Sequence, residues 1–136
     1  MATTRLISYE EASPEVREVF DDIRRTRKTD FINNMWLALA NDPALLRRTW
    51  SEVKAIMGQE SAIDPLTKEM LYIAVSATNG CGYCVHSHTA AARAKGMTDE
   101  QHGELLAIIA LAAKTNQLAS ALAVPVDSAF DRGQQN

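Results

Sequence analysis

Two cysteines, Cys81 and Cys84, stand three residues apart, directly after the helix-breaking pair Asn79-Gly80. At the start of a new helix, this spacing places both sulfurs on one face of the first turn. Unpaired amides and the helix dipole stabilise a thiolate there, so cysteines in such positions become nucleophiles at neutral pH. A disulfide between them closes a very small loop and can open and close without much effect on stability. The pattern therefore predicts thiol redox chemistry.

Two further residues are suited to move protons beside these sulfurs. His88 follows Cys84 by four residues, one turn along the same helix face, where an imidazole can accept or donate a proton. Glu69 lies in the preceding apolar segment, and a tight turn at Asn79-Gly80 could fold that segment back. We interpret Cys81, Cys84, His88 and Glu69 as the candidate catalytic residues.

Helix start and stop signals surround this motif on both sides. Serine or aspartate followed by proline, as an N-cap and first helical residue, recurs at residues 13–14, 42–43 and 64–65, and residues 98–101 fit a capping box. No convincing strand alternation is present. The pattern predicts helices from Pro14 to the basic run 24–28, over 31–40, from Pro43 to Gly58, over 66–77, from about Cys81 to Lys95, and from Thr98 towards Ala123.

Length and composition fit one all-α domain over residues 1–136, with a frayed C-terminal tail at about 125–136. Hydrophobic residues make up 46% of the chain, enough for a core that needs no disulfide. A net charge of −3 argues against a nucleic-acid partner. The longest apolar run, 105–113, is far short of the ~20 residues of a membrane helix. No secretory signal is visible, so we expect a cytoplasmic location, where a close cysteine pair indicates redox or metal chemistry.

The spaced set of Glu69, Cys81, Cys84 and His88 resembles the alkylhydroperoxidase D-like (carboxymuconolactone decarboxylase) superfamily, in its Cys-x-x-Cys-x-x-x-His redox branch. The shared pattern is a glutamate twelve residues before a Cys-x-x-Cys and a histidine four residues after the second cysteine. The resemblance is good over about residues 62–112, which we expect to form the redox core. The best-known peroxidase branch has a histidine between the cysteines, where this chain has Tyr83. Decarboxylase members lack the pair, which argues against decarboxylation here.

The resemblance implies a compact all-α fold of the alkylhydroperoxidase D-like type and an antioxidant thiol-dependent peroxidase or disulfide reductase. It implies that Cys84 attacks the peroxide, that Cys81 resolves the product as a disulfide, and that Glu69 and His88 move the proton. The expected partners are a peroxide substrate and a thiol or dithiol electron donor, with no cofactor and no metal. It also implies a homo-oligomer, a trimer or hexamer, which the apolar segments 105–123 and 31–40 favour independently.

One different reading remains open at this stage. Cys81, Cys84, His88 and either His86 or Glu69 could supply four ligands to a structural zinc ion. The chain would then be a non-catalytic helical oligomer with a structural or binding role. Covalent haem is disfavoured because Val85, rather than a histidine, follows the second cysteine.

Overall fold

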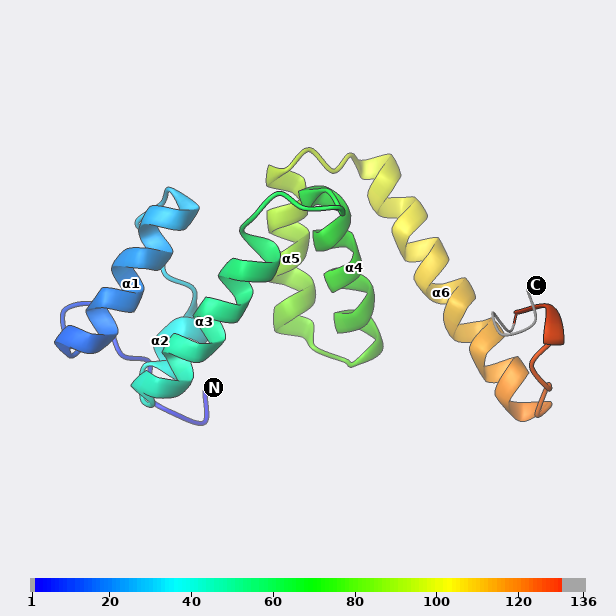
Figure 1. Ribbon diagram of the computed structural model, residues 1–136, viewed down its shortest axis with the longest axis horizontal. Helices are drawn as coiled ribbons and strands as arrows, with labels where there is room; N and C mark the ends of the chain where they lie inside the picture. Colours follow the sequence, from blue (N-terminus) through cyan, green and yellow to red (C-terminus); the bar gives the residue numbers. More distant parts are fainter. Residues whose placement is uncertain (1, 131–136) are drawn as a thin grey trace. The chain divides into compact units, whose positions relative to one another are not determined.

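The structure, a computed structural model, describes residues 2–130, and every regular element in that range is helical (Figure 1). The all-α prediction is therefore confirmed. By their internal contacts the residues form two compact units, with the boundary between Ala62 and Ile63. A single domain over residues 1–136 stays a prediction, as does a redox core at about 62–112. The frayed tail was predicted for about 125–136, and its last residues, 131–136, lie outside the described range.

The first unit contains helices α1 (Pro14–Arg27), α2 (Asn34–Leu39) and α3 (Pro43–Met57). Both longer helices begin as their sequences predict. Ser13 Oγ accepts the Val16 amide at 3.3 Å, and Asp42 Oδ1 accepts the Leu45 amide at 3.0 Å. These side-chain caps satisfy amides that have no partner within the helix.

Helix α2 is shorter than the predicted segment 31–40. It starts at Asn34, and the side chain of Phe31 is 66% exposed. Side chains bond the backbone just before it, since Thr29 Oγ1 accepts the Phe31 amide and Arg24 Nε donates to the Asp30 carbonyl. Such local bonds compete with helical ones, which explains the late start.

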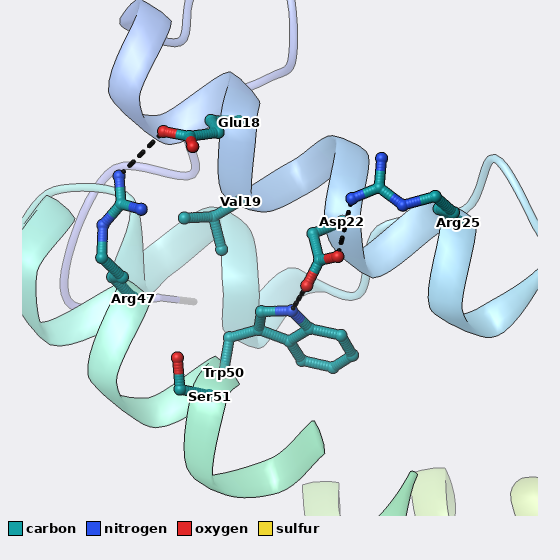
Figure 2. Close-up of a pocket in the computed structure, with 7 residues that line it drawn as sticks. All are labelled: Glu18, Val19, Asp22, Arg25, Arg47, Trp50 and Ser51. Atoms are coloured by element: carbon teal, nitrogen blue, oxygen red, sulfur yellow. Dashed lines mark hydrogen bonds and ion pairs between the residues drawn. The ribbon is translucent and has the colours of Figure 1, made fainter. Parts of the chain in front are cut away.

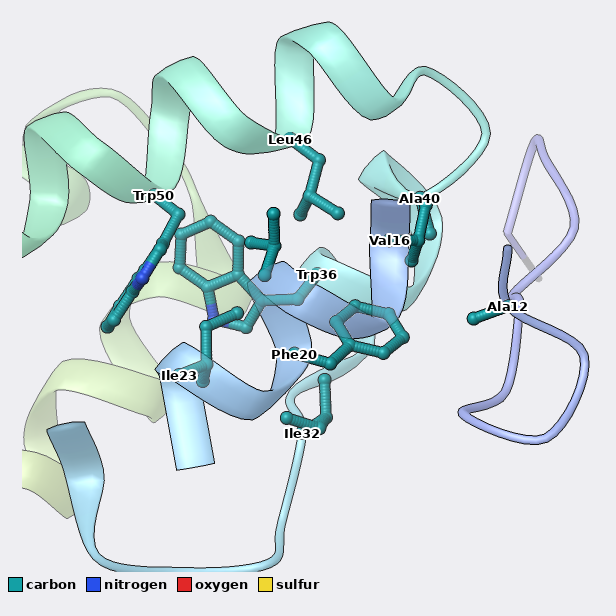
Figure 3. Close-up of a cluster of buried hydrophobic side chains, with 10 residues drawn as sticks. Ala12, Val16, Phe20, Ile23, Ile32, Trp36, Ala40, Leu46 and Trp50 are labelled. Atoms are coloured by element: carbon teal, nitrogen blue, oxygen red, sulfur yellow. The ribbon is translucent and has the colours of Figure 1, made fainter. Parts of the chain in front are cut away.

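An apolar cluster holds the first unit together (Figure 3). Trp36 and Trp50 meet edge to face, with ring centroids 5.5 Å apart. Both indoles are buried, so they are packing residues of this cluster. The cluster also contains one face of α1 and the first turns of α3: Val16, Val19, Phe20, Ile23 and Leu46.

The second unit contains α4 (Pro65–Thr78), α5 (Gly82–Ala94), α6 (Asp99–Ala121) and a short 3-10 helix, η1 (Ser128–Phe130). Helices α4 and α5 form an antiparallel hairpin, joined by the predicted turn at Asn79-Gly80 (Figure 1). Gly80 has a φ of +70°, a conformation that glycine adopts without a steric penalty. A small apolar cluster packs inside this unit: Ile73, Ala92, Met97 and Leu105.

Much of the apolar surface of the second unit is uncovered within one chain. The predicted capping box of α6 is present, with Thr98 and Gln101 bonding each other's backbone. Leu105 is the buried residue of this helix, whereas several of its large apolar side chains are about half exposed or more: Leu106, Ile108, Leu111 and Leu118.

Among residues 2–130, none of the helices has the length and apolar character needed to span a membrane.

Candidate active site

The two cysteines form a disulfide at the N-terminus of α5. Cys81 is the N-cap residue, and its Cα lies 5.4 Å from that of Cys84. The Cys84 amide donates to the Cys81 sulfur at 3.2 Å, so this sulfur occupies the place of a normal capping oxygen. Both residues are half-buried. The position is electropositive and within reach of a small reactant, which are the conditions that activate a thiolate.

The turn before the pair is fixed by the backbone of α4. The Cys81 amide donates to the Ser76 carbonyl at 2.9 Å, and the Gly80 amide donates to Ala77 at 3.2 Å. These bonds continue beyond the last turn of α4 and carry the chain directly into α5. The backbone of Cys81 is thus bonded to the end of α4 and to the start of α5.

Glu69 is buried between the two helices of this hairpin, with 5% of its surface exposed. Its Oε2 lies 2.7 Å from His88 Nδ1, and its Oε1 accepts a bond from Lys95 Nζ at 3.0 Å. Each carboxylate oxygen therefore has its own partner on α5. The hairpin therefore folds the Glu69 segment back, as the turn at Asn79-Gly80 predicted, and brings Glu69 to His88.

The protonation state of this carboxyl follows from its surroundings. Burial is the largest single influence and raises the pKa of Glu69, but the bonds and charges of His88 and Lys95 outweigh it together and hold the pKa below its usual value of 4.5. Glu69 is consequently ionised near neutral pH, and an ionised carboxylate only accepts hydrogen bonds. His88 Nδ1 therefore carries the hydrogen, which leaves Nε2 with the lone pair when the imidazole is neutral.

Tyr72 covers one face of the histidine. Its ring stacks on the imidazole of His88, with centroids 3.7 Å apart and planes 20° from parallel. Tyr72 itself is 39% exposed. The imidazole is therefore fixed at Nδ1 by Glu69 and on one face by an aromatic ring.

The structure pairs the four predicted residues two by two, and it places two further residues against them that were not predicted. The hairpin joins Glu69 to His88 directly, and the disulfide joins Cys81 to Cys84. Lys95 and Tyr72 were not predicted, although signals for both existed. Lys95 follows His88 by seven residues, two turns along the same helix face, and Tyr72 follows Glu69 by three.

The apolar helix α4 is buried on one face and exposed on another. Ile73 is fully buried, but Leu71 and Val75 are 51% and 60% exposed. Within the chain α4 packs against α5 and α6, and the face that carries Leu71 and Val75 has no such cover.

The zinc alternative finds no support in the geometry. Among residues 2–130, no group of three histidine, cysteine or acidic side chains is close enough to hold a metal ion. Glu69, one of its possible ligands, is instead bonded to the ammonium group of Lys95. A positive charge at that distance opposes the binding of a cation.

A separate hollow lies in the first unit, on the surface of α1 and α3 (Figure 2). Its charged groups are engaged with one another. Asp22 accepts from Trp50 Nε1 at 2.7 Å and pairs with Arg25 and Lys54, and Arg47 pairs with Glu18. The bond from Trp50, followed by that from Lys54, lowers the pKa of Asp22 to about 2. This arrangement stabilises the packing of two helices.

The chain is similar to known proteins in both its fold and its sequence. The crystal structure of the alkylhydroperoxidase AhpD core from Rhodospirillum rubrum ATCC 11170 is 64% identical in sequence and superimposes with a TM-score of 0.94. The match covers 96% of this chain and 97% of that one. The predicted alkylhydroperoxidase D-like fold is thereby confirmed.

Curated relatives match a shorter stretch. The alkyl hydroperoxide reductase AhpD of Solibacter usitatus (strain Ellin6076) is 44% identical over 64 residues, and that of Maricaulis maris (strain MCS10) is 41% identical over 61. These matches span 47% and 45% of this chain, but only 34% of each relative. The profile of the Carboxymuconolactone decarboxylase family matches residues 43–127, more than half of the chain. The chain therefore belongs to the Carboxymuconolactone decarboxylase family, and its relatives include proteins named for alkyl hydroperoxide reduction.

Proposed function

We propose that this protein is a thiol-dependent peroxidase that cycles Cys81 and Cys84 between dithiol and disulfide. The observation that carries the proposal is a disulfide at a helix N-terminus, on the same helix as a histidine fixed by a buried carboxylate. The names of the curated relatives support a hydroperoxide as the substrate. The catalytic residues are Cys84, Cys81, His88 and Glu69.

In the oxidative half-reaction, the Cys84 thiolate attacks the terminal oxygen of a hydroperoxide. The O–O bond breaks, Cys84 becomes a sulfenic acid, and the leaving alkoxide takes a proton to become an alcohol. His88 takes the thiol proton at Nε2 and returns it to the leaving oxygen, while Glu69 stabilises the imidazolium. Cys81 then attacks the sulfenic sulfur, which forms the disulfide and releases water.

In the reductive half-reaction, an external dithiol supplies two electrons and two protons. One donor thiolate attacks the disulfide to form a mixed disulfide, and the second donor thiol releases the reduced pair. The sulfur of Cys81 accepts the Cys84 amide, which stabilises negative charge on Cys81 when the disulfide opens. A cytoplasmic location fits this requirement, because reduced dithiols are maintained there.

The active form is a homo-oligomer, a trimer or a hexamer. Support comes from α6, where Ile108 and Leu111 are 62% and 61% exposed, and from Leu71 and Val75 on α4. Apolar surface of this extent on two helices of one unit is typical of an interface.

A stoichiometric oxidation experiment tests the function. The reduced protein is mixed with one equivalent of tert-butyl hydroperoxide, and free thiols and tert-butyl alcohol are measured. A peroxidase loses two thiols per chain and forms one alcohol. If the thiols persist with peroxide but a low-molecular-weight disulfide oxidises them reversibly, the protein is a disulfide reductase instead.

A further inference from the structure

Lys95 is the cation that contacts Glu69, and neither the motif nor the proposed chemistry uses it. Its Nζ lies 3.0 Å from Glu69 Oε1, on the oxygen opposite the one that faces His88. The backbone of Lys95 caps α5, and its amide bonds the carbonyls of Ala91 and Ala92. The backbone position from which this side chain extends is therefore fixed. The side chain itself is 36% exposed.

The charge on Glu69, which His88 and Lys95 together keep negative, determines what the bond between Glu69 and His88 can be. With an ionised carboxylate, Nδ1 donates to Oε2 and Nε2 is a base. With a protonated carboxyl, the acid donates to Nδ1, the hydrogen moves to Nε2, and no base remains. Burial alone favours the protonated carboxyl. The ammonium opposes this effect, because a positive charge at hydrogen-bond distance stabilises the ionised form.

We propose that Lys95 is a positioning residue for the peroxidase reaction: its ammonium group holds Glu69 ionised and oriented, so that His88 keeps the hydrogen on Nδ1 and offers Nε2 as the base. The proposal rests on the function given above for its catalytic consequence. The part of the proposal that concerns the tautomer of His88 does not depend on that function.

Among the described residues, Lys95 is the charged side chain that bonds Glu69 besides His88. Helix α5 supplies His88 and Lys95 as the titratable side chains bonded to the carboxylate. From α6, the side chains that pack into this unit's cluster are Leu105 and Ile109, which carry no charge. The cysteine pair is neutral as a disulfide.

The test compares three variants. Lys95→Met removes the charge and keeps the length, Lys95→Arg keeps the charge, and Lys54→Met is a matched control. Lys54 also bonds a carboxylate at 3.0 Å, that of Asp22, but in the first unit. The rate of thiol loss with tert-butyl hydroperoxide is measured from pH 5 to 9, along with the melting temperature.

In Lys95→Met, we expect the acid limb of the rate profile to move up by about one pH unit, because removing the cation makes proton uptake by the Glu69–His88 pair easier. The rate near the original midpoint should fall roughly fivefold and recover at high pH. Lys95→Arg should restore the original limb. Lys54→Met should lower the melting temperature without moving the limb. A purely structural Lys95 would lower the rate equally at every pH, and that result overturns the proposal.

Nitrogen NMR of His88 in the oxidised protein provides a readout that needs no turnover. The wild type should show the hydrogen on Nδ1 above the midpoint of proton uptake, and Lys95→Met should move that midpoint upwards. An unchanged midpoint in Lys95→Met would refute the inference even if the protein is a peroxidase. A shifted midpoint in a protein that consumes no peroxide would uphold the role of Lys95 at this site and refute the proposed function.

Discussion

The backbone amide of Cys84 donates a hydrogen bond to the sulfur of Cys81 at 3.2 Å, so one cysteine of the pair caps the helix that carries the other. The two sulfurs are therefore chemically different. Cys81 receives the amide, whereas Cys84 lies one helical turn before His88. This asymmetry underlies the different roles proposed for the two cysteines.

Serine substitutions separate these roles. Cys84→Ser should abolish turnover, whereas Cys81→Ser should still react once with peroxide and stop at a sulfenic acid on Cys84. Dimedone labelling followed by mass spectrometry identifies the trapped residue. A sulfenic acid on Cys81 in the Cys84→Ser protein would reverse the assignment.

The proton relay predicts strong, non-additive effects on the rate. Glu69→Gln and His88→Gln should each slow thiol oxidation by about 10²–10⁴ fold if they act in general acid–base catalysis. The double variant should be little slower than the worse single one, because residues of one relay act as a unit. Stopped-flow fluorescence or thiol quenching measures these rates. Unchanged rates in both single variants would remove the relay from the mechanism.

The disulfide should contribute little to folding stability. It closes a loop of only a few residues, and the chain-entropy model gives about 2 kcal/mol or less for such a loop. Reduction is therefore expected to lower the melting temperature by at most several degrees. Calorimetry with and without a phosphine reductant tests this, and a loss of tens of degrees would identify the bond as structural.

Asp22 makes the stability of the first unit dependent on pH. Its pKa is lowered from 3.8 to about 2, first by Trp50 and then by Lys54. The ionised form is therefore favoured by folding, and this stabilisation is complete above pH 4 and is lost as the pH falls towards 2. Asp22→Asn should cost roughly 2 kcal/mol at pH 7 and almost nothing near pH 2. Urea titrations at both pH values give the two differences, and an equal cost at both would contradict the argument.

The exposed apolar side chains of α6 predict that a charge there disrupts assembly. Ile108 and Leu111 are each more than 60% exposed, and we expect Ile108→Glu or Leu111→Glu to shift the sedimenting species towards the monomer. Gln117→Glu, on the same helix and also exposed, is the matched control. A wild-type protein that sediments only as a monomer at micromolar concentration would contradict the predicted oligomer.

The starts of the longer helices and the position of the cysteine pair could be predicted from the sequence alone. Ser13-Pro14, Asp42-Pro43 and Asp64-Pro65 are local signals, and each cap forms within four residues of the chain. The placing of Cys81 at the N-cap of α5 follows from Asn79-Gly80 in the same way. Such features depend on backbone geometry over one turn and need no tertiary contact.

The environment of Glu69 could not be predicted from the sequence, because it depends on contacts between helices. Its burial, its bond to His88 nineteen residues away and its bond to Lys95 twenty-six residues away depend on how α4 and α5 pack. The stacking of Tyr72 on His88 depends on the same packing. Spacing along a helix shows which residues share a face, but the partner that meets that face, and hence the protonation state of a buried carboxylate, is fixed by the contact between helices.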